Sequence, residues 1–244
     1  MKLLKLCVIV AFFLNVTFSF SQTNFSGIVN YETSINERKM IDYVNVKRKK
    51  IKNKQLIKTL DKVFLNTKSI KSTLLFSNGE GLFHVDDKIS INEKDLAEKI
   101  IRIFSGGSKI YYYNDSTKNY LIKDCESVGE CLIYDNTLLE WELTQESKII
   151  NGYTSYKATR RKGKVVAWYT PTIPVNFGPK GEFGLPGLIL ELEVGKVIFN
   201  ATKIVLNPKK QPKVEKPTNG KLVSKDEYNK ILQKAKESVF GKGN

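Results

Sequence analysis

The second half of the chain is a run of short alternating segments joined by tight turns, and this pattern limits the folds open to it. Apolar and polar side chains alternate through residues 138–206, and Asn151-Gly152, Lys162-Gly163 and Gly195 separate the segments. Turns this short join antiparallel strands, because a parallel pair needs a crossover of about a dozen residues or more. The pattern therefore predicts an antiparallel sheet.

The first half carries the same strand signals. Residues 72–85 read as a hairpin with Asn78-Gly79 at its tip, a dipeptide that accepts the positive φ angles of a two-residue type I′ turn. Residues 109–124 read as a second pair of strands around Asn114-Asp115-Ser116. We therefore expect strands on both sides of the middle of the chain.

Two segments show helical spacing instead. Residues 55–64 are amphipathic, and residues 92–104 place Leu96, Ile100, Ile103 and Phe104 on one face. Each segment could pack that face on the sheet. The predicted fold class is mainly β (α+β), with an antiparallel sheet, one or two packed helices and a C-terminal helix.

The ends of the chain differ from its middle. Residues 1–21 combine two lysines, an apolar stretch and Ser19-Phe20-Ser21, which is the order of a secretory signal peptide cleaved before Gln22. The apolar stretch is shorter than the roughly 20 residues of a membrane span, and Cys7 lies away from the cleavage point. We expect an exported protein of the periplasm or the exterior that does not span a membrane and carries no lipid anchor.

The remaining sequence divides into three parts. Residues 22–206 form the predicted β-rich domain, and residues 207–223 form a linker rich in proline and lysine. Residues 224–240 are a predicted helix that starts with a capping box, Ser224 and Glu227. This helix either docks on the domain or presents its apolar stripe to a partner.

The positive charge does not indicate nucleic-acid binding. The formal net charge is +15, but 35 lysines and only 5 arginines carry it. Recognition of bases and phosphates favours the bidentate geometry of arginine. The sequence therefore predicts no nucleic-acid partner.

Cys125 and Cys131 are the cysteines that remain after cleavage of the signal peptide. Outside the cytosol such a close pair is typical of a structural disulfide. Free thiols and a redox or metal site are the alternatives, but a zinc site would need further ligands, and His84 is the single histidine. We predict a disulfide, no metal site and no cofactor.

The stretch GEFGLPGLILELEVG, residues 181–195, combines turn residues with apolar ones. Pro186 and Gly187 suit the second and third positions of a type II turn. Such a turn would lead into a buried strand through Leu188, Ile189 and Leu190. We interpret Gly184, Leu185, Pro186, Gly187, Leu188 and Ile189 as a structural motif at the rim of the core.

This motif and its surroundings resemble the GLPGLI proteins, a family of exported Bacteroidota proteins. The strings EWELTQESKIINGYTSYKATRR, AWYTPTIPVNFGP and GLPGLILELE, within residues 138–195, carry the resemblance. Ser155 lies where family members often have a cysteine. The resemblance implies no established reaction or ligand. A weaker similarity to LolA-like half-barrels implies a curved sheet with an apolar cavity beneath its helices.

The sequence contains no recognisable catalytic constellation: nucleophile elbow, zinc-binding helix and phosphate-binding loop motifs are all missing. His84 is interpreted as a surface residue of the first hairpin. Paired carboxylates at Glu140, Glu142, Glu191 and Glu193 leave a carboxylate-dependent hydrolase of the envelope as the alternative function.

Aromatic residues of the strand region offer a binding surface instead. A concave sheet could gather them around an apolar or sugar ligand, although cross-strand packing explains them equally well. The predicted binding set is Trp141, Tyr153, Trp168, Tyr169 and Phe177. The leading hypothesis is a monomeric, non-enzymatic binding or scaffold protein that holds an apolar ligand or an envelope protein.

Overall fold

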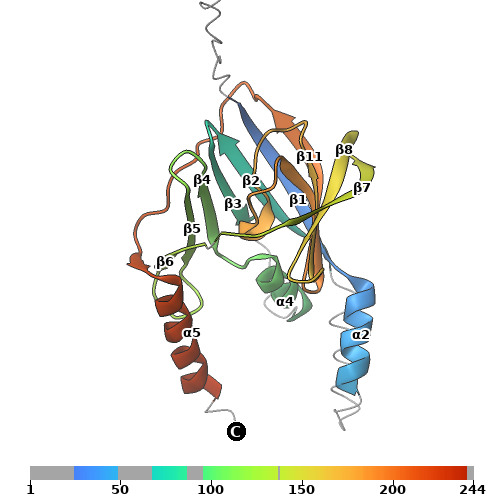
Figure 1. Ribbon diagram of the computed structural model, residues 1–244. Helices are drawn as coiled ribbons and strands as arrows, with labels where there is room; N and C mark the ends of the chain where they lie inside the picture. The colour runs from blue at the N-terminus through green and yellow to red at the C-terminus, as the bar shows by residue number, and fades with distance from the viewer. Residues whose placement is uncertain (1–24, 49–67, 87–95, 137, 241–244) are drawn as a thin grey trace, which may run out of the picture.

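A computed structural model describes residues 25–48, 68–86, 96–136 and 138–240, and within them the chain forms one curved 12-stranded sheet (Figure 1). The strand order is β12-β6-β5-β4-β3-β2-β1-β11-β10-β9-β8-β7. The strands are β1 (Ser26–Ile35), β2 (Ile70–Ser77), β3 (Glu80–Val85), β4 (Ile110–Asn114), β5 (Asn119–Asp124), β6 (Leu132–Asp135), β7 (Glu142–Ile150), β8 (Tyr153–Arg160), β9 (Val165–Thr170), β10 (Leu188–Val194), β11 (Val197–Leu206) and β12 (Lys221–Val223). The mainly β, curved fold class is confirmed.

Neighbouring strands are antiparallel except at one edge, where β12 pairs parallel to β6. The predicted tight turns join the hairpins. Asn78 and Gly79 have φ angles of 53° and 78°, and Asn151 and Gly152 have φ angles of 50° and 81°. Positive φ at both central positions is the geometry of a type I′ turn, as the Asn-Gly dipeptides indicate.

The main core lies on one face of the sheet. Tyr31, Phe83 and Phe199 are buried there and meet edge to face, with ring centroids 6.2–6.3 Å apart. On the other face, Tyr112, Leu121 and Ile133 form a small cluster that Val214 covers. The sheet is thus apolar on both faces near β4–β6, because the chain after β11 crosses back over that region.

Three helices accompany the sheet in the described residues: α2 (Glu37–Arg48), α4 (Leu96–Ser105) and α5 (Lys225–Phe240). The sequence prediction missed α2 and placed a helix at residues 55–64, which lie outside the described residues. The helix predicted at residues 92–104 corresponds to α4, and its predicted apolar face is only partly correct. Ile101 is fully buried, whereas Ile103 is 68% exposed.

The face of α4 differs because the helix packs against two partners. Ile101 joins the main core, while Ile100 and Phe104 pack around Met40 of α2. A helix that contacts both a sheet and another helix buries a wider stripe than spacing alone indicates. No helix of the described ranges is long and apolar enough to cross a membrane.

The range predicted as a linker, residues 207–223, ends in β12 and therefore takes part in the sheet. Its backbone is attached to the disulfide loop, since the Lys221 N–H donates to the Cys131 carbonyl over 2.8 Å. Val223 is buried. The predicted Cys125–Cys131 disulfide is confirmed. The signal peptide predicted at residues 1–21 lies outside the described residues.

Helix α5 begins with the predicted cap, as the Glu227 N–H donates to Ser224 Oγ over 3.1 Å. Tyr228 anchors the helix: its ring stacks on Tyr134 at 3.9 Å, and its hydroxyl donates to Asp124 Oδ2 over 2.7 Å. Beyond this anchor the helix extends away from the sheet (Figure 1). Ile231 and Leu232 also pack against the main core, so the described part of the chain shows α5 docked by its first two turns.

Asp124 links the anchor to the disulfide loop. Its Oδ1 accepts the Ser127 N–H and its Oδ2 lies 3.0 Å from Lys109 Nζ. Burial alone would raise the pKa of Asp124, but hydrogen bonds from Ser127, Tyr228 and Lys109 outweigh it and hold that pKa well below its usual value. The Asp124 carboxylate is charged. Loss of one hydrogen-bond donor would therefore leave this charge less well compensated, but the group would stay ionised.

We expect Tyr228→Phe to lower the free energy of unfolding by about 1 kcal/mol, because Asp124 loses one hydrogen bond. Tyr228→Ala also removes the stack on Tyr134 and should cost about 3 kcal/mol. Urea denaturation of both variants measures these differences. Lys230→Ala, an exposed change on the same helix, is the control. A Tyr228→Ala variant as stable as the control would show that α5 is not docked in solution.

Candidate functional site

The chain between β9 and β10, residues 171–187, is called the inserted loop below, because it lies against the core face of the sheet. The side chain of Tyr113, in β4, makes two hydrogen bonds to the backbone of this loop. The buried Tyr113 hydroxyl donates to the Gly178 carbonyl over 2.8 Å and accepts the Gly181 N–H over 2.9 Å. One phenol thus satisfies two backbone groups at the short 3-10 turn η1 (Pro179–Gly181).

Side chains from other elements complete the attachment. Trp141 Nε1 donates to the Phe183 carbonyl over 2.9 Å, and Asn136 Nδ2 donates to the Gly181 carbonyl over 2.6 Å. Just after the loop, at the start of β10, the Tyr31 hydroxyl donates to the Ile189 carbonyl over 2.6 Å. The inserted loop therefore has its backbone bonded into the core at several points, although it is irregular.

A buried ion pair lies at the middle of the inserted loop. Arg160 of β8 binds Glu182 with two parallel hydrogen bonds, one of them 2.8 Å from Nε to Oε2. Both side chains are less than 10% exposed, and the Trp141 ring lies 5.4 Å from the guanidinium carbon. Paired geometry of this kind compensates both buried charges and fixes the position of Glu182.

The Gly184–Ile189 motif forms the end of the inserted loop and the start of β10. Leu185, Leu188 and Ile189 are buried, as the alternation predicts. The predicted type II turn is wrong. Gly187 has φ of 151° instead of about 80°, and the Leu188 N–H donates to the Ile173 carbonyl, not to Leu185. The motif is hydrogen-bonded to the beginning of the inserted loop instead, so the hydrogen bond from Leu188 to Leu185 that would close a type II turn does not form.

Gly187 is required by close packing as well as by its φ angle. A Cβ atom there would lie 2.1 Å from the carbonyl oxygen of Thr170, which is backbone and cannot rotate away. Gly184, in the same loop, also has positive φ, but a Cβ atom there would meet nothing nearer than 3.9 Å. A side chain at Gly184 would therefore meet backbone strain alone, whereas a side chain at Gly187 would meet backbone strain and a steric clash.

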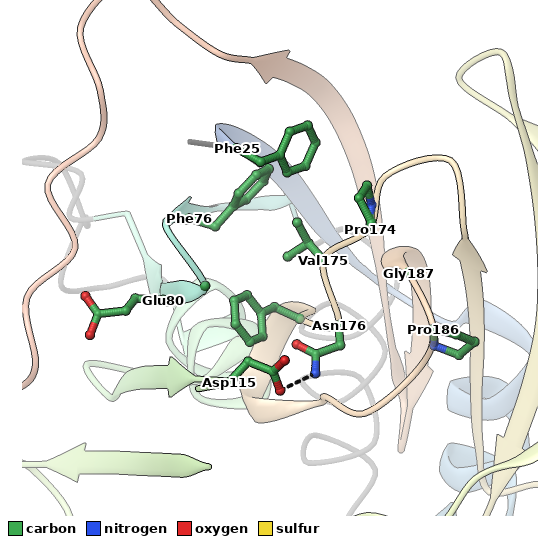
Figure 2. A pocket seen from close by; sticks show the side chains of 11 residues that line it. Phe25, Phe76, Glu80, Asp115, Pro174, Val175, Asn176, Pro186 and Gly187 are labelled. Carbon is green, nitrogen blue, oxygen red and sulfur yellow. Dashed lines mark hydrogen bonds between the residues drawn. The ribbon is translucent and has the colours of Figure 1, made fainter. Parts of the chain in front are cut away.

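A pocket of about 380 Å³ opens beside this motif (Figure 2). Its walls come from the start of β1, the β2–β3 turn, the β4–β5 turn and the inserted loop. The lining residues are Phe25, Phe76, Gly79, Glu80, Asp115, Pro174, Val175, Asn176, Phe177, Pro186 and Gly187. The motif identified from sequence therefore forms one wall of a cavity.

Apolar side chains dominate one side of the pocket. Phe25 and Phe76 lie together, with ring centroids 5.6 Å apart, and Val175 and Pro174 are beside them (Figure 2). Phe177 stacks on Tyr113 at 4.9 Å, so the pocket wall continues directly into the core. This side offers an aromatic and aliphatic surface to a ligand.

Asp115 and Asn176 form the polar edge of the pocket, where Asn176 Nδ2 donates to Asp115 Oδ1 over 2.7 Å (Figure 2). The same Oδ1 accepts from Lys118 Nζ at 2.8 Å and from the Tyr120 hydroxyl at 3.1 Å. Burial alone would raise the pKa of Asp115, but the donors Lys118, Asn176 and Tyr120 outweigh it and lower that pKa. The edge is therefore a fixed, charged carboxylate.

Glu80 borders the pocket but its carboxylate is directed elsewhere. It accepts hydrogen bonds from the Tyr112 hydroxyl and from Asn114 Nδ2. Tyr112 belongs to the opposite face of the sheet, and Figure 2 shows the Glu80 side chain pointing away from the aromatic residues. Asp115 is thus the lining carboxylate that faces the pocket.

The predicted aromatic set does not form one surface. Of its five members, Phe177 lines the pocket. Trp168 and Tyr169 are consecutive on β9 and therefore face opposite sides of the sheet. Trp141 supports the inserted loop, as described above, and Tyr153 packs half-buried against the core. Sequence reasoning missed Phe25, Phe76, Val175 and Asn176, which carry no signal until the fold brings them together.

Two of the four predicted carboxylates form ion pairs with neighbouring lysines. Glu191 pairs with Lys148 at 2.7 Å, and Lys148 Nζ lies 4.3 Å from the centroid of the Trp168 ring. Glu193 pairs with Lys39 and accepts a hydrogen bond from Asn36 Nδ2. Glu140 and Glu142 lie before and at the start of β7, which β9 and β8 separate from β10 in the sheet order. The geometry gathers no catalytic carboxylate pair from this set.

Lys180 is a partly buried cation in the inserted loop. Its Nζ donates to the Phe104 carbonyl of α4 over 2.5 Å. Burial, opposed by Glu182 and reinforced by Lys109, lowers the pKa of Lys180 from 10.5 to about 8. The ammonium charge is therefore retained near neutral pH at a cost to the folded state.

We expect Gly184→Ala to lower the unfolding free energy by about 1–2 kcal/mol through its positive φ. Gly187→Ala should cost about 3 kcal/mol or more, since the Thr170 backbone must also move. Denaturant titration of the matched pair measures the difference. Equal losses in the two variants would contradict the proposed collision.

Lys180 predicts a specific pH dependence. Between pH 8 and 10.5 the unfolded chain keeps a proton on this amine that the folded chain has lost, so its contribution makes stability rise with pH over that window. We expect Lys180→Met to remove this rise. Melting temperatures of both proteins from pH 7 to 10.5 test it, and parallel curves would contradict the lowered pKa.

Comparison with known proteins gives one family match, which covers the part of the pocket wall that the inserted loop supplies. A family model described as a protein of unknown function (Porph_ging) matches residues 159–191, from the end of β8 through the inserted loop into β10. No curated protein matches. Two structures of PNGF-II, in the P21 and C2 space groups, are similar over 88% and 87% of this chain, at 16% and 15% identity and TM-scores of 0.51. The chain spans about a third of their length, 34% and 33%, and at this identity the likeness concerns the fold alone.

Proposed function

We propose that the protein is an exported, non-enzymatic binding protein of the cell envelope that holds the apolar part of a ligand in the pocket beside the Gly184–Ile189 motif. The observation that carries this proposal is the placement of Pro186 and Gly187 in the pocket wall. The most distinctive string of the sequence thus borders a cavity lined by three phenylalanines.

The size and support of the pocket favour binding. A volume of about 380 Å³ falls in the range of small-molecule sites. The inserted loop is hydrogen-bonded to Tyr113, Asn136 and Trp141, so the wall exists before a ligand arrives. A preformed wall avoids the entropy cost of ordering a loop upon binding.

The location of the pocket differs from the sequence hypothesis of a cavity between the concave sheet and the helices. The core face is filled by Tyr31, Phe83, Phe199 and the inserted loop. The pocket lies instead at the end of the sheet that carries the β2–β3 and β4–β5 turns. A LolA-like role in lipid transfer therefore receives no support from this cavity.

Export, membership of the GLPGLI family and a monomeric state remain parts of the proposal. The signal-peptide pattern of residues 1–21 supports export. The GLPGLIL string and the match over residues 159–191 support the family. An envelope protein that inserts an apolar side chain would use the same pocket as a small ligand.

Binding of the neutral apolar dye N-phenyl-1-naphthylamine tests the pocket. We expect saturable fluorescence enhancement with the wild-type protein. Pro174→Trp, which places a bulky ring in the lining, should weaken binding at least about tenfold, equivalent to about 1.4 kcal/mol. Thr172→Trp is the matched control, because Thr172 is exposed in the same loop and does not line the pocket.

The dye is excited at a wavelength that tryptophan does not absorb, so the added rings do not interfere. Equal binding to Pro174→Trp and Thr172→Trp would contradict the assignment of the pocket. Failure of the wild-type protein to bind the dye at all would contradict the proposed function.

A further inference from the structure

The polar edge of the pocket offers acceptor atoms to a ligand. Three donors, from Lys118, Tyr120 and Asn176, converge on Asp115 Oδ1. Within the described residues no hydrogen bond reaches Asp115 Oδ2. The Asp115 side chain is 40% exposed and lines the pocket, so a ligand in the pocket can approach this carboxylate.

Asn176 adds a second acceptor at the same place. Its Nδ2 is turned toward Asp115, which leaves the amide Oδ1 without a partner among the described residues. Its backbone carbonyl is already used, because it accepts the Gly184 N–H over 2.9 Å. The amide orientation follows from the charge of Asp115, since a carboxylate accepts and cannot donate.

The charge at this edge is negative even though the chain as a whole is basic. The cation nearest to Asp115 is Lys118, which lies on the Oδ1 side and is 70% exposed. An exposed lysine compensates a neighbouring carboxylate only in part, because water screens it. A ligand carboxylate or phosphate beside Asp115 would therefore meet like charge.

We infer that the pocket selects an apolar molecule that ends in a hydrogen-bond donor, an ammonium or hydroxyl group, and rejects the same apolar molecule ending in a carboxylate. The aromatic side formed by Phe25, Phe76 and Phe177 takes the apolar part, and Asp115 with Asn176 takes the donor. This inference rests on the proposed function and names the ligand class for the same site. A fatty acid, which ends in a carboxylate, is therefore not an expected ligand.

Three matched probes test the selection: 2-(1-naphthyl)ethylamine, 2-(1-naphthyl)ethanol and 1-naphthylacetate. Each displaces bound N-phenyl-1-naphthylamine from the full-length exported protein if it enters the pocket. We expect the amine and the alcohol to displace the dye at concentrations at least about tenfold lower than the acid. In ¹⁵N–¹H spectra, the amides of Gly79, Val175 and Asn176 should shift with the amine.

Two variants assign the selection to Asp115. Asp115→Asn removes the charge and should bring the amine and the acid within about threefold of each other. Lys118→Met removes an exposed counter-ion and should widen the preference for the amine. Asp135→Asn is the matched control, because Asp135 is exposed and does not line the pocket.

The outcomes separate this inference from the proposed function. Suppose that all three probes displace the dye equally from the wild-type protein and that Pro174→Trp abolishes this displacement. The inferred selectivity would then be wrong, but the assignment of the pocket would stand. Preference for the acid would also overturn the inferred selectivity. An unfolded Asp115→Asn variant leaves Lys118→Met to decide, and an unchanged preference in Lys118→Met would then contradict the role of Asp115.

Discussion

The buried hydroxyl group of Tyr113 connects the irregular part of the chain to the regular part. It donates to one backbone carbonyl and accepts one backbone N–H of the inserted loop, and both groups are too far inside the protein to find water. Without this bridge, Gly178 and Gly181 would leave two polar groups unsatisfied in an apolar core, at a cost of about 1–3 kcal/mol each. The sheet supplies Tyr113 from β4, so a strand and a distant loop must form together.

The pocket follows from the same constraint. Because η1 and the buried Arg160–Glu182 pair fix the middle of the inserted loop, its two ends emerge at a defined place beside the β2–β3 and β4–β5 turns. Pro174, Val175 and Pro186 then line the same opening as Phe25 and Phe76. Binding walls supported by a packed core hold their geometry better than walls built on isolated loops.

Local patterns predicted the parts of the fold that depend on local chemistry. Asn78-Gly79 forms the expected type I′ turn, Asn151-Gly152 forms the expected turn between two strands, and Ser224 caps α5 as expected. Predictions from the sequence were wrong where tertiary contacts override local conformational preference. Gly187 looked like a type II turn residue, but Leu188 bonds to Ile173 instead. Ile103 fits the apolar spacing of α4, but contacts with two partners bury Ile101 instead.

The candidate site was predicted less completely than the fold. Phe25, Phe76, Asp115 and Val175 come from four segments far apart in the chain, so no spacing rule connects them. Of the aromatic residues selected from the sequence, Phe177 lines the pocket, whereas Trp141 donates to the Phe183 carbonyl. Such a residue looks the same in sequence whether it binds a ligand or the backbone.

The central claim is that the inserted loop is a part of the core and not a surface connection. Native-state amide hydrogen exchange tests it most directly at Gly181, Gly184, Leu188 and Ile189, whose N–H groups bond to Tyr113 and to the first half of the loop. The account predicts that these amides exchange as slowly as those of β1 and β11, through global unfolding. Fast exchange of these four amides beside a protected sheet would contradict it.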